Sequence, residues 1–331
     1  MLCSVIILNW NGVAMLRRFL PSVLSTTQLD GVEVVVADNG STDGSLSYLH
    51  TQPVRVIELG ENLGFAEGYN RAIAQVDAQY VLLLNSDVEV TPLWLDTLLE
   101  YARAHEDVAA IQPKVLSYHD KHKFEHAGAA GGMMDCLGYP YCRGRFLSYL
   151  EEDHGQYDTP AQIFWATGAC MLVRRDLYIQ VGGLDAQFFA HQEEIDLCWR
   201  FNSRGYRVMS VPQSVVYHVG GGTLGYESPR KTFLNFRNNL LMLYKNLPAS
   251  NWWVVSFFRF FLDYVAALQM LLSGKLLNAK AVIQARLAFV KMRREYKNIR
   301  NYNLRNAKTA YPNTISRRSI IIDYYLRGMR K

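Results

Sequence analysis

Apolar runs of strand length alternate with segments of helical spacing through the first third of the chain, and this alternation restricts the fold more than any other feature. The runs are rich in Val, Ile and Leu, as in parallel strands that are buried on both faces of a sheet. Strands are expected at 4–8, 32–37, 54–59, 80–84 and 108–111. Helical patterns cover 14–24, 45–50, 64–76 and 92–105. The alternation predicts an α/β fold with a doubly wound, mostly parallel sheet.

Polar residues follow several of these strands at the point where each strand ends. The carboxyl ends of parallel strands share one edge of a sheet, and folds of this class bind ligands there. The residues in question are Asn9, Asn11, Asp38, Asn39, Asn85 and Asp87, with Asn62, Gly64 and Asn70 at and after the start of the 64–76 helix. Asn, Asp and Gly also make turns and helix caps, which explains any one segment equally well. Four such segments together predict a ligand site.

The part of the chain after residue 111 has a less regular pattern of apolar residues. Residues 117–159 have weak periodicity, so we expect irregular loops on the acceptor side of the site. The expected elements after it are a strand at 164–173, a helix at 193–204, short strands at 207–211 and 215–217, and a helix that begins at Ser228-Pro229. Gly220 to Thr223 has the composition of a mobile loop over the site.

A long apolar segment at 251–273 begins a different kind of region. Its length is close to the roughly 20 residues needed to span a bilayer. Arg259 and Asp263 lie one helical turn apart in its middle, and central charges are costly in lipid. A helix on the membrane surface or packed on the protein is therefore favoured over a true span, which stays open. We expect a first domain at 1–245 and a helical, membrane-associated tail at 246–331.

Charge and cysteine content narrow the class of protein. The net charge is +5, and basic residues accumulate from Arg286 onward, which suits anionic lipid, a phosphorylated substrate or nucleic acid. We expect no nucleic-acid partner, because the chain contains no recognisable nucleic-acid-reading module. The five cysteines have no zinc-type spacing and are expected to be reduced thiols, and the start of the chain lacks a leader pattern. These features predict a cytoplasmic protein.

At this point the chain resembles a known family. Segments 5–12, 35–44 and 62–70 look like the opening motifs of family 2 glycosyltransferases, 82–87 stands at the place of that family's DXD motif, and 188–200 resembles its later acidic motif. The match runs through residues 3 to 245 in order. It is similar to the branch with rhamnosyltransferase-like and galactofuranosyltransferase-like enzymes. The resemblance implies a GT-A fold and an enzyme that uses a nucleotide-diphosphate sugar.

The nucleotide contacts are predicted from the strand ends. Asp38 can accept from a uracil-like imide N–H, and Asn9 and Asn39 can complete contacts to the base edge or ribose. The resemblance implies the same role for Asp38. We expect Asn11, Asn62, Gly64, Asn70 and Asn85 near the nucleotide. Arg237 suits the diphosphate but is equally consistent with a structural role. A UDP- or dTDP-sugar is the expected donor.

A divalent cation, Mg²⁺ or Mn²⁺, is the expected cofactor, because a diphosphate leaving group needs its charge neutralised. Asp87 is the main metal candidate. The sequence departs from the usual motif at Asn85, which stands in place of its first aspartate and weakens the ligand set by one charge. Glu89 lies two residues on and is a possible compensating acid. The resemblance implies that His218 is a metal ligand, although a lone His is as often a packing residue.

Two acids at the start of the 193–204 helix are the catalytic candidates. Glu193 and Glu194 are favourable there because of the helix dipole, so a structural role also fits. The resemblance implies that Glu194 is the general base of an inverting transfer to a hydroxyl of a lipid-linked or polysaccharide acceptor, in synthesis of a cell-surface glycan at the inner face of the membrane. The alternative is a catalytically inactive sugar-nucleotide-binding or scaffolding subunit, which the Asn85 departure keeps open.

Overall fold

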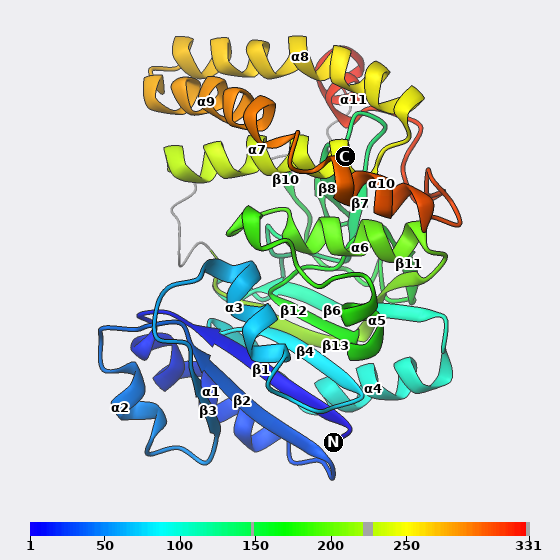
Figure 1. The fold of residues 1–331 in the computed structure, drawn as a ribbon. Helices are drawn as coiled ribbons and strands as arrows, with labels where there is room; N and C mark the ends of the chain where they lie inside the picture. Colours follow the sequence, from blue (N-terminus) through cyan, green and yellow to red (C-terminus); the bar gives the residue numbers. More distant parts are fainter. Residues whose placement is uncertain (147–148, 221–227, 329–331) are drawn as a thin grey trace.

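A nine-stranded sheet forms the centre of the molecule in the computed structural model, which describes residues 1–146, 149–220 and 228–328 (Figure 1). One half is parallel, with neighbours in the order β4-β1-β2-β3. These strands are β1 (Cys3–Asn9), β2 (Val32–Asp38), β3 (Arg55–Glu58) and β4 (Tyr80–Asn85). All four were predicted, because buried parallel strands read as continuous apolar runs.

The other half of the sheet is mixed. β12 (Cys170–Arg174) lies antiparallel between β4 and β6 (Val108–Ser117). β13 (Arg207–His218) runs parallel to β6 and pairs antiparallel with β11 (Ala161–Ile163) and β5 (Val88–Val90). The expected strand at 164–173 was too long, since only its last part is in the sheet. The two strands expected at 207–211 and 215–217 are one strand with an irregular register between Val211 and Val215.

Helices cover both faces of the sheet, as doubly wound folds require. The helices of this part are α1 (Val13–Thr26), α2 (Ser45–Leu49), α3 (Gly64–Ile73), α4 (Trp94–Ala104) and α5 (Arg175–Gln180). Successive β1 side chains alternate between two hydrophobic clusters: Ile6 belongs to the cluster that includes α3, and Val5 and Ile7 to the one that includes α1 and α4. The mostly parallel α/β sheet is therefore confirmed.

A second, small antiparallel sheet lies in the segment that was expected to form irregular loops. It contains β7 (Gly132–Met134), β8 (Pro140–Cys142), β9 (Arg145–Phe146) and β10 (Tyr149–Leu150) in the order β10-β9-β8-β7. That expectation was wrong for these residues. Strands of two or three residues are too short to show an alternating pattern, so the sequence carries no signal for them.

Helices stack over one face of the sheet, on the same side as α3, in the order α6, α7 and then the α8–α9 pair (Figure 1). They are α6 (Glu193–Ser203), α7 (Pro229–Asn246), α8 (Ala249–Leu272), α9 (Leu276–Met292), α10 (Lys297–Arg305) and α11 (Ile320–Arg327), and a 3-10 turn, η1 (Ala186–Phe188), precedes α6. The predicted loop at Gly220–Thr223 lies, after Gly220, outside the described residues. The domain boundary at 245 stays a prediction. It falls near the end of α7, and α7 packs on α9, which lies beyond the boundary.

The charged pair in the middle of α8 faces the protein. Arg259 Nε lies 3.1 Å from Asp263 Oδ1, and both side chains are buried. Arg286 of α9 also pairs with Asp263, and Asn239 of α7 accepts from Arg259. By length and composition, α8 passes as a membrane span, and it is the one helix in the described ranges that does. The pair nevertheless has its partners within the protein, so these charges do not require a polar partner in lipid.

Candidate active site

The ends of β1 and β2 place Asn9 and Asp38 opposite each other in the sheet register. Asn9 Nδ2 donates to Asp38 Oδ2 at 3.0 Å and to Ser41 Oγ at 3.1 Å. The backbone N–H groups of Asn11 and Ser41 donate to Ser41 Oγ and Asp38 Oδ1, respectively. The Asn9 Oδ1 atom is buried without a hydrogen-bond partner in the described structure. The two strand ends therefore present a fixed polar pair with one unused acceptor.

Asn39 and Asn62 build the turn that leads into α3. Asn39 Oδ1 accepts from the Leu63 N–H, and Asn39 Nδ2 donates to the Gly64 carbonyl at 3.1 Å. Asn62 Oδ1 accepts from the Gly64 N–H at 3.0 Å. Gly64 has φ +79°, and a Cβ there would lie 2.5 Å from the Phe189 ring. Only glycine fits this close approach between α3 and the segment before α6.

Asn70 does not join this group. Its Oδ1 accepts from the Tyr178 hydroxyl at 2.6 Å and from the Leu184 N–H at 3.0 Å, and its Nδ2 donates to the Leu184 carbonyl at 2.8 Å. Protein partners thus occupy both ends of the amide. The contacts give Asn70 a structural role, in which it ties α3 to the segment before η1, and do not support the predicted contact with the nucleotide.

Asp87 and His218 come together although 131 positions separate them along the chain. His218 ends β13, which pairs with β5 next to Asp87, and its Nε2 lies 3.1 Å from Asp87 Oδ1. Asn85 Nδ2 is 3.4 Å from the same His218 nitrogen. The three predicted residues therefore share one small space at the sheet edge. Carboxylate, amide oxygen and imidazole are donors that Mn²⁺ and Mg²⁺ accept to different degrees, with imidazole favouring Mn²⁺.

A buried carboxylate that the sequence did not reveal lies behind His218. Glu125 Oε2 is 3.5 Å from His218 Nδ1, and Glu125 is 4% exposed. The expected compensating acid, Glu89, instead pairs with Lys121. Burial lowers the pKa of His218, but Asp87 and Glu125 outweigh it and raise that pKa to about 10. Metal-binding histidines commonly have such a carboxylate on their second nitrogen.

These side chains can hold a divalent cation only if other ligands complete its coordination shell. Within residues 1–146, 149–220 and 228–328, no group of three or more His, Cys, Asp or Glu side chains is arranged to hold a metal. Asp87, His218 and the amide of Asn85 offer at most three positions, whereas Mg²⁺ and Mn²⁺ prefer about six. Diphosphate oxygens and water would have to complete the shell.

The segment before α6 is strained. Phe189, His191 and Gln192 have φ values of 65°, 70° and 74°, a region that non-glycine residues rarely adopt. Asn238 of α7 is fully buried, and its Nδ2 lies within 3.0 Å of the carbonyl oxygens of Phe188, Ala190 and His191. Strained backbone persists where surrounding structure over-determines it, and this is common at functional sites.

Arg237 contacts the same segment rather than facing open space. Its Nη2 donates to the carbonyls of Gln187 and Phe188 at 2.9 and 3.1 Å, and its Nε donates to Asn238 Oδ1. The Phe189 carbonyl in turn accepts from the N–H groups of Phe65 and Ala66 at the start of α3. These contacts give Arg237 a structural role, and its predicted contact with the diphosphate stays a prediction.

Glu193 and Glu194 stand directly after this strained segment, at the start of α6. Each has one buried carboxylate oxygen, Oε2, with no hydrogen-bond partner among the described residues. Burial raises the pKa of Glu194 to about 7. Burial and the charge of Glu194 raise the pKa of Glu193 well above its ordinary value. A buried carboxylate near neutrality with free acceptor capacity has the properties of a general base.

A family model described as "Glycosyl transferase family 2" matches residues 4–182, more than half of the chain. The chain belongs to glycosyl transferase family 2. It is therefore a glycosyltransferase, and the strand-end site lies within or beside the matched region.

Named relatives agree with this assignment. The glycosyltransferase is 30% identical over 256 residues to the N-acetylglucosaminyl-diphospho-decaprenol L-rhamnosyltransferase of Mycobacterium tuberculosis, which covers 72% of this chain and 82% of the relative. It is 31% identical over 216 residues to the O-antigen biosynthesis protein RfbC of Myxococcus xanthus, which covers 62% of this chain and 16% of that protein. The resemblance to the rhamnosyltransferase-like branch is confirmed.

Solved structures with low sequence identity share the fold. S. aureus TarS 1-349 in complex with UDP-GlcNAc superposes with a TM-score of 0.56 at 17% identity, over 92% of this chain and 89% of that fragment. GalNAc-T7 with UDP, GalNAc and Mn²⁺ gives a TM-score of 0.58 at 16% identity, over 75% of this chain and 48% of that one. The glycosyltransferase therefore has the GT-A fold with a C-terminal helical region.

Asp196 and Arg200 of the acidic motif have structural partners in this glycosyltransferase. Asp196 is fully buried and accepts from Arg200 Nε at 3.0 Å, Lys245 Nζ at 2.9 Å and Asn246 Nδ2 at 2.8 Å. Arg200 also donates to the carbonyls of Val181 and Gly183. Arg200 therefore holds Asp196 and the preceding loop in place.

Proposed function

We propose that this enzyme is an inverting glycosyltransferase that moves a sugar from a nucleotide-diphosphate donor to a hydroxyl of a lipid-linked or polysaccharide acceptor. The observation that carries this proposal is the half-buried Glu194 at the start of α6, whose Oε2 is buried without a partner and whose pKa is about 7. One ionisable base with a pKa near neutrality suits a single displacement, in which no covalent sugar–enzyme intermediate forms.

Glu193 and Glu194 have different protonation states and different roles in the proposed reaction. Like charges that are close together cannot both ionise at low cost, so the pair carries no more than one negative charge, on Glu194. In the proposed reaction, the Glu194 carboxylate accepts the proton of the acceptor hydroxyl while that oxygen attacks the anomeric carbon. The bond from that carbon to the diphosphate oxygen breaks on the opposite side. Glu193 stays protonated and limits the negative charge beside Glu194.

The donor end of the site is proposed to contain Asn9, Asp38 and the turn built by Asn39 and Asn62. The Asn9–Asp38 pair is prepositioned, and the unused Asn9 oxygen can accept from the base or ribose. We propose a UDP- or dTDP-linked deoxyhexose as donor, because the relative in Mycobacterium tuberculosis is named as an L-rhamnosyltransferase. The same name, which includes a diphospho-decaprenol acceptor, supports a lipid-linked acceptor in cell-surface glycan synthesis.

Asp87, His218 and Asn85 are proposed to hold Mg²⁺ or Mn²⁺ together with the diphosphate. When bound, the cation neutralises the charge that develops on the leaving diphosphate. The proximity of Asp87 and His218 supports this role. Glu125 lies 3.5 Å from His218 Nδ1, an ion-pair distance without a hydrogen bond, and its charge can orient the ring.

A peripheral position on the inner face of the membrane fits the exposed side of α8. Its apolar residues there include Trp253, Phe257, Phe261, Val265, Leu268 and Leu272, while the charged Arg259 and Asp263 face the protein. A helix with one apolar face open to solvent and charges on the other side suits a membrane surface. A lipid-linked acceptor would be met there.

The inactive-subunit alternative rests on one observation, the Asn85 substitution in the metal site. The two hypotheses, an active glycosyltransferase and an inactive subunit, are tested by measuring nucleotide release from UDP- and dTDP-sugars by the purified chain. The measurement is made with Mn²⁺, with Mg²⁺ and with chelator. Cation-dependent release from at least one donor is the expected result. Donor binding without release or transfer under any of these conditions would favour the scaffolding role.

A further inference from the structure

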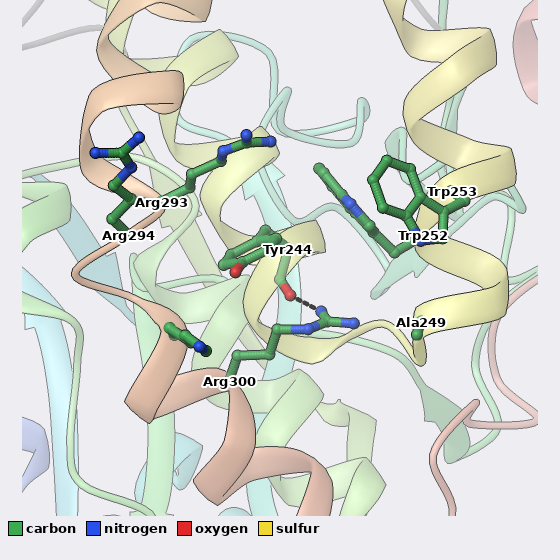
Figure 2. Close-up of a pocket in the computed structure, with 8 residues that line it drawn as sticks. Tyr244, Ala249, Trp252, Trp253, Arg293, Arg294 and Arg300 are labelled. Carbon is green, nitrogen blue, oxygen red and sulfur yellow. Dashed lines mark hydrogen bonds between the residues drawn. The ribbon is translucent and has the colours of Figure 1, made fainter.

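A cavity of about 400 Å³ lies where the end of α7, the start of α8 and the α9–α10 connection meet (Figure 2). Four cations and two tryptophans line it: Arg293, Arg294, Lys297, Arg300, Trp252 and Trp253. Figure 2 shows Arg293 extending from the end of α9 toward the tryptophans, and Arg300 reaching the other side of Tyr244 from α10. The cavity is positively charged and partly aromatic.

Among the residues that the structure describes, these four cations have no acidic partner. Across the described ranges, no carboxylate forms a salt bridge with any of them, whereas the neighbouring Arg259 and Arg286 both pair with Asp263. Arg300 is 8% exposed, donates to the backbone carbonyl of Tyr244, and stacks 5.0 Å from that ring. Burial lowers the pKa of Arg300. A buried cation without a counter-ion is costly, and an anion in the cavity would reduce that cost.

This cavity is separate from the catalytic site. Lys245 and Asn246 on α7 face α6, where both contact Asp196. The Tyr244 ring faces away from α6 and packs on Trp252 and on Phe289 of α9. Helix α7 therefore stands between the cavity and the acids at the start of α6, as the layer order in Figure 1 also shows. An anion bound here is not the diphosphate of the sugar donor.

The cavity opens beside the exposed apolar face of α8. Trp253, which lines it, is 69% exposed, and Phe257, one turn further along α8, is 60% exposed. Tryptophans are enriched at the level of lipid headgroups, and Arg and Lys next to an apolar face bind anionic lipids. An aromatic edge, unpaired guanidinium groups and an adjoining apolar surface together match a phosphate that is attached to acyl chains.

We propose that this cavity binds the phosphate group of an anionic membrane phospholipid and thereby fixes how the enzyme sits on the membrane. The proposal rests on the membrane association proposed above. The planar, forked guanidinium groups of Arg293, Arg294 and Arg300 suit phosphate oxygens, and Lys297 adds a point charge. The acyl chains would lie along the apolar face of α8.

The test uses the full chain and co-sedimentation with vesicles of phosphatidylcholine alone or with about 30 mol % phosphatidylglycerol. The pocket variant is Arg293→Gln with Arg294→Gln. The matched control is Lys280→Gln with Lys291→Gln, which removes the same charge from positions of α9 outside the cavity that are exposed, as Arg293 and Arg294 are. Thermal unfolding and nucleotide binding check that both variants are folded.

Wild type and control are expected to bind the phosphatidylglycerol vesicles more tightly than the neutral ones by about tenfold or more. The pocket variant should lose most of that preference and keep its binding to neutral vesicles. Equal losses in both variants would mean diffuse attraction and would overturn the site. Failure of the wild type to bind any vesicle would overturn membrane association itself, a separate and earlier failure.

Two further arms identify the source of the phosphate. Inorganic phosphate at millimolar concentration, without lipid, should not protect the wild type from thermal unfolding more than it protects the pocket variant. Neutral vesicles with a small fraction of polyprenyl diphosphate should bind wild type and pocket variant equally. A response of the cavity residues to free phosphate or to polyprenyl diphosphate, with none to phosphatidylglycerol, would overturn the phospholipid assignment.

Discussion

At the scale of single residues, Glu194 is the residue on which the proposed mechanism depends most. Its ordinary pKa is 4.5, and burial raises it to about 7. A general base acts when it is ionised, so kcat/KM should rise about tenfold per pH unit below pH 7 and level off above it. Glu194→Gln should lower kcat by about 10³-fold or more and leave nucleotide binding nearly unchanged. Full activity in that variant would contradict the assignment.

The same pKa has a consequence for stability. A group whose pKa is raised in the folded state contributes stability below its unfolded value of 4.5, and this contribution is lost as the pH rises through about 7. The Glu194→Gln variant has no carboxylate to ionise, so it does not lose this stability as the pH rises. The variant should therefore unfold at a higher temperature than wild type at pH 8, and the difference should shrink toward pH 4.

Glu125 carries the second residue-scale prediction. Its carboxylate lies 3.5 Å from His218 Nδ1 and also accepts from the Ala127 N–H. Glu125→Gln preserves shape but removes the charge that orients the ring, so Mn²⁺ binding in the presence of nucleotide should weaken by about 10–100-fold. Calorimetry with Mn²⁺ is the direct readout. Glu89→Gln is the control, because Glu89 pairs with Lys121 instead, and equal losses in both variants would contradict the role of Glu125.

Residues that follow a strand are easier to predict than residues brought in from a distance. Asn9, Asp38 and Asp87 follow apolar runs, and the sheet edge they share follows from parallel strand pairing. Glu125 lies in a segment without periodicity, 93 positions before His218, so nothing in the sequence links the two. Asn70 was placed near the nucleotide by its spacing on α3, but Tyr178 and Leu184 are partners that only the tertiary structure supplies.

At the scale of elements, α7 shapes the segment before α6. Asn238→Ala would remove the amide that lies near three carbonyl oxygens and would release the strained backbone at Phe189, His191 and Gln192. Because Glu194 follows that segment, kcat should fall by about 10–100-fold. The KM for the donor should change less, since the donor end is built by β1, β2 and α3. A change in KM alone would contradict this role.

Helix α8 is held to the protein by its buried charges. Asp263 is fully buried and pairs with Arg259 and Arg286, so Asp263→Asn leaves two buried guanidinium groups without a full counter-charge. Removing one partner of a buried ion pair costs about 3–5 kcal/mol. Urea unfolding should show a loss of this size. A loss below about 1 kcal/mol would mean that α8 is held mainly by apolar contacts.

Elements differ in how far the sequence predicts them. The pairing of Arg259 with Asp263 was predicted from their spacing of one helical turn, and the start of α7 at Pro229 was predicted from Ser228-Pro229. The four short strands from β7 to β10 were not predicted. Each is too short for an alternating pattern, and their pairing depends on contacts across the loop.

At the scale of the whole molecule, the sheet and the helical tail are joined by a buried polar network. Lys245 of α7 contacts Asp185 and Asp196, and Tyr296, after α9, donates to Asp185. Asn303 of α10 donates to Asn246. The tail is thus part of the support for the acidic motif, and point variants on its surface test membrane binding more cleanly than deletion of the tail.

The central claim is that the chain transfers a sugar from a nucleotide donor with inversion. The most direct measurement is the NMR assignment of the anomeric configuration in the product made from a UDP- or dTDP-sugar and a lipid-linked acceptor, with Mn²⁺ or Mg²⁺ present. The account predicts a glycosidic bond of configuration opposite to that of the donor, and no such product from Glu194→Gln. A product that retains the donor's configuration would contradict it.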